Sequence, residues 1–224
     1  MATLDLISNL HRRPDASLAQ RRYAALATRY DATCHRVEPL RALAIDKLDL
    51  RPGDTVIDVA CGTGATTEVL ARAVGPGGCV IGIELSPQMA VLGSQRLRSA
   101  GLGQARIEVV AVQHAVLAEH ADAFLFSYTH DVLQQPEAVA ALAHLAKPGA
   151  RYALLGMRTL PWVWGWPVNL FVMWRARRYL TTHHGLGAPW ARLQAVSGEF
   201  ELVGSWHAGT SYLALGTFSQ GDDF

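Results

Sequence analysis

The sequence predicts an α/β fold, a doubly wound Rossmann-like sheet of seven strands that is mostly parallel, with helices on both faces. Half of the 224 residues are apolar and only 17% are charged, which fits one large domain with a substantial core. Short apolar runs alternate with helical segments of about ten residues, the pattern of parallel strands joined by right-handed crossovers. Two strand-like runs near the C-terminus, joined by a short glycine-containing turn, predict a closing hairpin that places an antiparallel strand last in the sheet.

The elements follow in chain order from apolar periodicity and from turns rich in Pro and Gly. Residues 17–50 have helical spacing interrupted at Pro39, which predicts two helices before the first strand. The strands of the alternating region are expected at Thr55–Val59, Cys79–Ile83, Ile107–Val112, Ala123–Ser127 and Arg151–Gly156. The helices between them are expected at Thr66–Val74, Pro87–Ser99 and Glu137–Ala146. The hairpin strands are expected at Phe200–Ser205 and Tyr212–Phe218.

No repeat, low-complexity segment or Gly/Ser-rich linker divides the chain, so we expect a single domain. Its parts are N-terminal helices and lid (1–50), a cofactor-binding core (51–156), a helical substrate-lid insert (157–197) and the closing hairpin (198–224).

Composition excludes several classes of function. The net charge is +1 and no Lys/Arg stripe extends beyond Arg175–Arg178, which argues against nucleic acid as a partner. The three cysteines lack CxxC spacing, so neither a disulfide framework nor a structural zinc is expected. Residues 1–15 mix acids and bases without an apolar core, and no run reaches the roughly 20 apolar residues of a membrane span. We therefore expect a soluble, cytoplasmic protein.

The stretch 58-DVACGTG-64 follows the first strand, at the sheet edge where doubly wound folds bind their ligands. No Lys follows Gly64, so it is not a P-loop. A dinucleotide fingerprint needs a third glycine where Thr67 stands, and Asp58 would repel a pyrophosphate but attract an ammonium group. The loop therefore favours a cationic amino-acid cofactor, although a plain tight turn remains the alternative.

Glu84 follows the second strand, about twenty residues after this loop. An acidic side chain there can accept two hydrogen bonds from ribose hydroxyls. Glu84 also lies just before Ser86, a possible helix N-cap, and both interpretations are compatible.

The motifs DVACGTG, GIELSPQM after the second strand and HLAKPGA before the fifth resemble the class I S-adenosylmethionine-dependent methyltransferases. The most similar subgroup is the ubiquinone/menaquinone-biosynthesis and small-molecule methyltransferases, over roughly residues 28–156 and the terminal hairpin. The resemblance implies S-adenosylmethionine as cofactor and S-adenosylhomocysteine as product. It also implies that the methionine part is lined by Asp58, Ala60, Gly62 and Gly64, that Glu84 holds the ribose, and that Leu85 and Met89 flank the adenine.

The resemblance extends to further positions, with one departure. Where the family often has an Asp that accepts from the adenine amino group, this chain has Gln113, followed by His114; a glutamine carbonyl can accept the same bond. A surface role for Gln113 remains open. Ser127 matches a position that faces the methionine part, and Tyr30 matches a tyrosine that helps cover the cofactor.

Methyl transfer from a sulfonium is an in-line displacement, so the protein supplies mainly orientation and a dry pocket, with a base where the acceptor loses a proton. His130, beside Asp131, is the main candidate for this base, and Tyr30 is a second catalytic candidate. Alternatively, His130 is a solvated residue beside a helix cap. The neighbours His183 and His184 cannot form an i, i+4 metal pair, and no metal is expected.

Residues 161–190 hold five of the six tryptophans, with a helix expected at Val168–Leu180. This segment is a core helix, the wall of an aromatic acceptor pocket, or a membrane-surface patch. The lack of a Lys/Arg-rich face favours the pocket over the membrane. The expected substrate-binding residues are Tyr128, Trp162, Trp166, Trp174 and His207.

The predicted function is therefore methyl transfer from S-adenosylmethionine to an oxygen or nitrogen of a small hydrophobic or aromatic metabolite. The alternatives are a phospholipid-headgroup or quinone-precursor methyltransferase at a membrane surface, and a non-catalytic S-adenosylmethionine-binding protein. The expected partner is a small molecule, without nucleic acid, and the protein is expected to be a monomer or homodimer.

Overall fold

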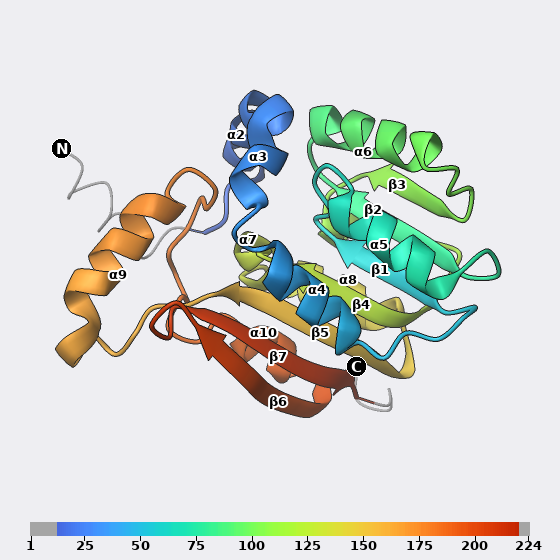
Figure 1. Cartoon of the computed structure of the whole chain (residues 1–224). Coiled ribbons are helices and arrows are strands. Elements are labelled where there is room, and N and C mark those ends of the chain that lie inside the picture. The colour runs from blue at the N-terminus through green and yellow to red at the C-terminus, as the bar shows by residue number, and fades with distance from the viewer. Residues whose placement is uncertain (1–12, 220–224) are drawn as a thin grey trace.

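The computed structural model describes residues 13–219, and one seven-stranded sheet in the order β3-β2-β1-β4-β5-β7-β6 forms its centre (Figure 1). The strands are β1 (Thr55–Val59), β2 (Cys79–Glu84), β3 (Ala105–Val109), β4 (Ala121–Ser127), β5 (Ala146–Met157), β6 (Ser197–Trp206) and β7 (Ser211–Phe218). Pairing is parallel from β3 through β5, and β7 runs antiparallel to both β5 and β6. The predicted fold class is confirmed, including the single antiparallel strand.

The helices pack on both faces of this sheet. Before β1 come α2 (Ala16–Leu26), the 3-10 turn η1 (Ala27–Arg29), α3 (Tyr30–Cys34) and α4 (Glu38–Asp46). Within the alternating region lie α5 (Ala65–Val74), α6 (Pro87–Ser99), η2 (Val112–His114), α7 (His130–Leu133) and α8 (Pro136–His144). After β5 come α9 (Trp162–Ala176) and α10 (Ala191–Gln194). No helix among residues 13–219 has both the length and the apolar character that crossing a bilayer requires.

The alternation of side chains along the central strands divides the core in two. Val56 packs with α4 and α5 on one face, whereas its neighbour Ile57 packs with α8 on the other. In β4 the same alternation separates Leu125 from Phe124 and Phe126. Because successive strand residues point to opposite faces, a strand covered by helices on both sides is apolar throughout. This is why these strands are recognisable as unbroken apolar runs.

Several predicted boundaries were wrong, and residues 17–50 form three α-helices rather than two, with Pro39 in the first turn of α4. β3 ends at Val109 rather than 112, because its partner β2 ends at Glu84 and the last pair is Glu84 with Val109; residues 112–114 form η2 instead. β5 spans Ala146–Met157 rather than 151–156. α9 begins at Trp162 rather than 168 and contains Pro167. The helix tolerates this proline because the carbonyl it leaves unpaired belongs to Val163, which is 94% exposed.

The start of α5 and the middle of α6 approach each other through two glycines. A Cβ on Gly93 would lie 2.3 Å from Ile107 Cδ1 and 3.2 Å from the backbone nitrogen of Gly64. We expect Gly93→Ala to lower the free energy of unfolding by about 1–3 kcal/mol, because overpacking outweighs the better helix propensity of Ala. Urea unfolding measures this. The control is Gly77→Ala, where nothing lies within 4 Å; an equal effect of both variants would contradict the close approach.

Candidate functional site

Two adjoining cavities lie at the carboxyl ends of the central strands. The first, which we call the edge cavity, is bordered by the loop after β1, the end of β2, the segment after β3 and the end of β4, and is closed by the N-terminal helix α2. The second, which we call the inner cavity, lies between α3, α4, β5 and the end of α9. A doubly wound sheet places its ligands at this edge, where the strand order reverses between β1 and β4.

The glycine loop uses its own amides to hold its shape. Ala60, Gly62 and Gly64 all have positive φ, at 52°, 59° and 71°. The backbone N–H of Cys61 donates to Ile83 O at 3.1 Å, that of Gly62 to Glu84 Oε2 at 2.9 Å and that of Gly64 to Cys61 O at 3.1 Å. Because these three N–H groups already have acceptors, the loop does not present them to a phosphate.

Glu84 ties the glycine loop to the end of β2. Besides the bond from Gly62, its Oε1 accepts the backbone N–H of Ser86 at 2.7 Å, so one carboxylate fixes two segments. The side chain is buried on the cavity wall, and burial raises the pKa of its carboxyl group. An ionised carboxylate offers about four acceptor sites, so Glu84 retains capacity for ligand hydroxyls.

Asp58 lies beneath the loop, at the end of β1. The hydroxyls of Thr66 and Thr67 each donate to its Oδ2 at 2.7 Å, while its buried Oδ1 has no hydrogen-bond partner among the described residues. Burial raises the pKa of this carboxyl group to about 6, against the opposing effect of the two threonine bonds. A buried, partly unsatisfied carboxylate of this kind favours a nearby cationic group.

This pKa makes a prediction about stability without ligand. Because the folded-state pKa lies above the unfolded value of 3.8, Asp58 destabilises the folded protein increasingly as pH rises from about 4 to about 6. We expect the unfolding free energy of the wild type, relative to Asp58→Asn, to fall by up to about 3 kcal/mol across this window. Denaturant unfolding of both proteins at several pH values measures the difference between their unfolding free energies. The contributions of all other titrating groups cancel in this difference, because the two proteins share them. A pH-independent difference would contradict the raised pKa.

The charge of the edge cavity selects against phosphates. Three carboxylates border it, from Asp15, Glu84 and Asp131, and the described residues that line it include no Lys, Arg or His. A pyrophosphate would meet negative charge and no donor cation, whereas a ligand with ammonium and sulfonium groups would be attracted. The donor set therefore fits S-adenosylmethionine and does not fit NAD.

The segment around Tyr30 is fastened over the glycine loop. The Asp31 carboxylate accepts the hydroxyl of Thr63 at 2.5 Å and also pairs with the guanidinium of Arg96 on α6. A Cβ placed on Gly62 would lie 3.7 Å from the ring of Tyr30, so the ring lies directly above the loop. Residues 30–31 thus join the N-terminal helices to the cofactor-binding core.

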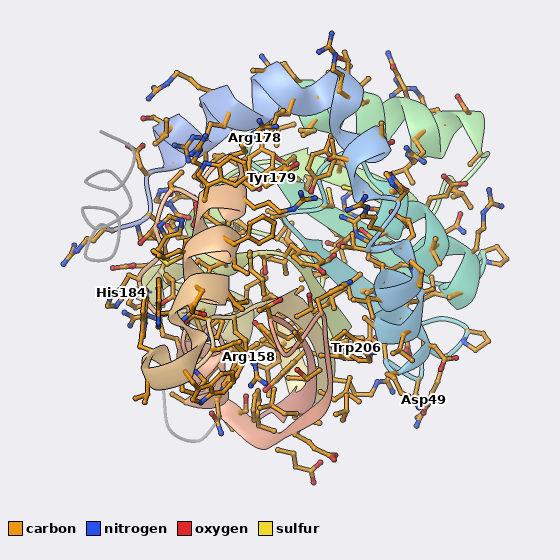
Figure 2. The ribbon with its side chains drawn as sticks, turned by 60° about the vertical axis from the view of Figure 1, so that its left-hand side comes forward. Asp49, Arg158, Arg178, Tyr179, His184 and Trp206 are labelled. Atoms are coloured by element: carbon orange, nitrogen blue, oxygen red, sulfur yellow. The ribbon has the colours of Figure 1, made fainter. Side chains whose placement is uncertain are left out.

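The two cavities meet at a cluster of tyrosines, which we call the tyrosine junction. The residues that border both cavities are Tyr23, Tyr30, Tyr128, Thr129, Tyr179 and Leu180. The rings of Tyr23 and Tyr30 meet edge-to-face with centroids 6.0 Å apart, and those of Tyr30 and Tyr179 at 6.5 Å. Tyr179 lies just after α9, on the side of the helix that faces the N-terminal segment (Figure 2). Three distant parts of the chain therefore build one narrow passage.

Tyr128 at this junction is held in an unfavourable conformation. Its φ is 60°, in the left-handed region that large side chains rarely adopt. Its hydroxyl is buried without a hydrogen bond of normal geometry. Strain and unsatisfied polar groups of this kind concentrate at binding sites, so the geometry is consistent with the predicted substrate contact of Tyr128.

His130 begins α7 and borders the inner cavity. Both of its ring nitrogens are buried without a hydrogen bond of normal geometry, and burial lowers its pKa to about 4 against the opposing effect of the His184 backbone. The expected pairing with Asp131 does not form, because Asp131 Oδ2 accepts the backbone N–H of Thr181 at 2.8 Å and its hydroxyl at 2.6 Å. His130 is thus neutral near pH 7 and able to accept a proton from a molecule in the inner cavity.

Arg41 on α4 is a further residue of the inner cavity, one that sequence reasoning missed. Its buried guanidinium donates to Ser127 Oγ at 3.2 Å and pairs with Glu38 at 2.8 Å. It therefore connects the inner cavity with the end of β4. No motif marks it, because an arginine within a helix is normally assigned to the solvent face.

The structure separates the predicted cofactor-binding residues into two groups. Those that border the edge cavity are Tyr30, Ala60, Gly62, Glu84, Leu85, Gln113 and Ser127. Those that do not border it are Asp58, Gly64, Met89 and His114. Asp58 lies one layer deeper, Gly64 packs against Gly93, Met89 is fully buried, and His114 is exposed.

The predicted aromatic pocket wall does not coincide with either cavity. Trp162, Trp166 and Trp174 border neither cavity, and their side chains are 48%, 55% and 46% exposed. His207 is exposed in the β6–β7 turn and contacts Ser211 Oγ at 2.9 Å, outside both cavities. The inner cavity is instead walled by tyrosines, leucines and the two arginines Arg41 and Arg175.

The chain is similar in sequence to known methyltransferases. Residues 56–149 match the family model described as a methyltransferase domain. The chain is 33% identical to nocamycin O-methyltransferase of Saccharothrix syringae over 131 residues, which are 58% of this chain and 44% of that protein. It is 28% identical to the ubiquinone/menaquinone biosynthesis C-methyltransferase UbiE of Burkholderia mallei over 141 residues, 59% of this chain and 57% of that protein.

The fold agrees with a solved structure as well. A SAM-dependent methyltransferase of Aquifex aeolicus superposes with a TM-score of 0.60 at 17% identity, covering 80% of this chain and 89% of that chain. Such a likeness concerns the fold alone. The chain spans about half the length of each of these two curated relatives. The family model ends at residue 149, so the insert that contains α9 lies outside it.

Proposed function

Because the chain carries a class I S-adenosylmethionine-dependent methyltransferase domain, we propose that it transfers a methyl group to an oxygen or nitrogen of a small, largely hydrophobic or aromatic acceptor. The observation that supports this most directly is the pair of adjoining cavities. An acid-lined cavity at the sheet edge suits the cationic methyl donor, and a mostly apolar cavity next to it suits the acceptor.

The residues of the edge cavity would hold the cofactor. Glu84 would accept the ribose hydroxyls, and Ala60 and Gly62 would lie along the methionine part, with the charge of Asp58 beneath them. When bound, S-adenosylmethionine supplies a methyl group on a sulfonium, which leaves as the neutral thioether of S-adenosylhomocysteine. The ring faces at the tyrosine junction would favour a cation there and exclude water from the passage.

His130 would serve as the base. As the acceptor oxygen or nitrogen forms its bond to the methyl carbon, that atom loses a proton, and a ring nitrogen of His130 takes it. The lowered pKa keeps the imidazole neutral for this step at physiological pH. Tyr128 and Arg41 would orient the acceptor, Tyr128 through its unsatisfied hydroxyl and Arg41 through its buried charge.

Calorimetry and product analysis test this proposal together. S-adenosylmethionine and S-adenosylhomocysteine should bind with micromolar dissociation constants, and NADH should not bind. A panel of phenols, amines and hydroxylated aromatic metabolites should then yield one methylated product, whose methyl position is read by NMR. Tight NADH binding would overturn the cofactor assignment. Cofactor binding with no turnover of any panel member would favour the non-catalytic alternative.

A further inference from the structure

Helix α9 has two apolar faces, of which the protein covers only one. The buried residues of the helix recur every three or four positions, at Gly165, Asn169, Val172, Met173 and Ala176. Such spacing defines a single stripe along an α-helix, and this stripe faces the body of the protein. Figure 1 shows α9 at the edge of the molecule, apart from the sheet.

The exposed side of α9, which we call the outer face of α9, carries eight apolar side chains between residues 162 and 174. They make up eight of the fourteen large apolar side chains that are exposed among the described residues, so this helix concentrates more than half of them. Val163, Trp164 and Phe171 are 94%, 63% and 58% exposed. A continuous exposed patch of this kind marks an interaction surface.

The sequence on either side of α9 carries charges of one sign only. Residues 138–198 contain no Asp or Glu but seven Lys or Arg, although the whole chain has a net charge of only +1. Three of these cations, Arg175, Arg177 and Arg178, follow directly at the C-terminal end of the outer face and are exposed. The Arg177 guanidinium lies over the ring of Trp174, 4.9 Å from its centre. The arginine end of the helix is seen in Figure 2 at Arg178.

The exposed apolar side chains and the neighbouring arginines together indicate what binds the outer face of α9. Tryptophans beside arginines, on a helix too short to span a bilayer, suit the boundary between lipid headgroups and acyl chains. A second copy of the chain packed on this face would offer no Asp or Glu from residues 138–198 to pair with these arginines. An anionic lipid surface supplies the missing negative charge.

We propose that the outer face of α9 docks on an anionic lipid surface, with its apolar side chains inserted at the headgroup boundary and its arginines against the headgroups. This goes beyond the proposed methyl transfer, and it favours a membrane surface for this segment where its composition favoured a pocket. Arg175 and Ala176 border the inner cavity from the same helix. A docked α9 would therefore bring the inner cavity next to the lipid, where an apolar acceptor is concentrated.

Vesicle co-sedimentation of the full chain tests the proposal. We expect binding to vesicles of phosphatidylcholine with phosphatidylglycerol, much weaker binding to phosphatidylcholine alone, and loss of binding at high salt. The double variant Trp164→Glu/Phe171→Glu should reduce binding at least ~10-fold, because it replaces two inserted side chains with charges. The matched control is Val116→Glu, at a loop residue that is 93% exposed and far from α9 in sequence; it should bind as the wild type does.

Several outcomes would overturn the proposal. The first is that the wild type does not sediment with anionic vesicles, and the second is that the double variant sediments as well as the wild type. The third is that the wild type is a dimer in gel filtration and the double variant a monomer, which would assign the outer face to a second copy of the chain. Calorimetry with S-adenosylmethionine separates this proposal from the methyl-transfer proposal. The double variant should bind the cofactor with wild-type affinity. If the wild-type protein binds the cofactor but does not bind vesicles, only the docking proposal is contradicted.

Discussion

Glu84→Ala is expected to weaken S-adenosylmethionine binding by about 100-fold or more. The carboxylate would accept two ribose hydroxyls, and hydrogen bonds to a charged group contribute about 1.5–3 kcal/mol each. The variant also leaves the N–H groups of Gly62 and Ser86 without their acceptor, which loosens the glycine loop. Calorimetry gives the change in dissociation constant, and circular dichroism verifies that the variant is folded.

Two further variants sharpen this test. Glu84→Gln retains the shape and one carbonyl acceptor, so its loss of affinity should be smaller than that of Glu84→Ala. Glu119→Ala removes a partly exposed acid that pairs with Arg106 outside both cavities, and it should leave cofactor binding unchanged. Equal affinity of the wild type and Glu84→Ala would exclude Glu84 from the cofactor site.

His130→Ala is expected to lower turnover by about 100-fold or more while cofactor affinity stays at the wild-type value. A positioned general base typically contributes 10²–10⁴-fold, and the side chain borders the inner cavity rather than the edge cavity. Single-turnover rates at saturating cofactor measure the chemical step, and His144→Ala, an exposed histidine on α8, is the control.

The pH profile gives this role an independent signature. Because burial lowers the pKa of His130 to about 4, its neutral form persists from pH 8 down to about 5. The single-turnover rate at saturating cofactor should therefore be lost only as pH falls toward 4, whereas cofactor affinity should weaken from about pH 6 as Asp58 takes up a proton. The profile of His130→Ala should lack this acidic limb. If turnover of His130→Ala equals that of the wild type, His130 is not the base, and its burial serves packing alone.

Much of the fold and the cofactor side of the site could be predicted from local sequence. β1 and α6 have the predicted bounds, because each is set by signals within the segment itself: an apolar run after a Pro-Gly turn, and Ser86 capping a helix that starts at Pro87. Glu84, Gly62 and Ser127 line the edge cavity as expected, since the ends of parallel strands meet at one edge.

The acceptor side could not be predicted in the same way. A histidine and an aspartate adjacent in sequence suggested a pair, yet Asp131 bonds Thr181, fifty residues away, and leaves His130 alone. The tryptophans suggested a pocket, yet the tyrosines at the junction form it. Arg41 carried no signal, because its burial depends on where α4 packs against β4 and β5.

The sequence by itself therefore determined the alternating sheet, the acid-bearing glycine loop and the type of cofactor they fit, because strand burial on both faces and backbone geometry leave local patterns. Tertiary structure alone decided which face of α9 is covered, which residues meet between the two cavities and which buried groups lack partners. Those outcomes depend on contacts between segments far apart in the chain, and an amphipathic or aromatic stretch does not specify what packs against it.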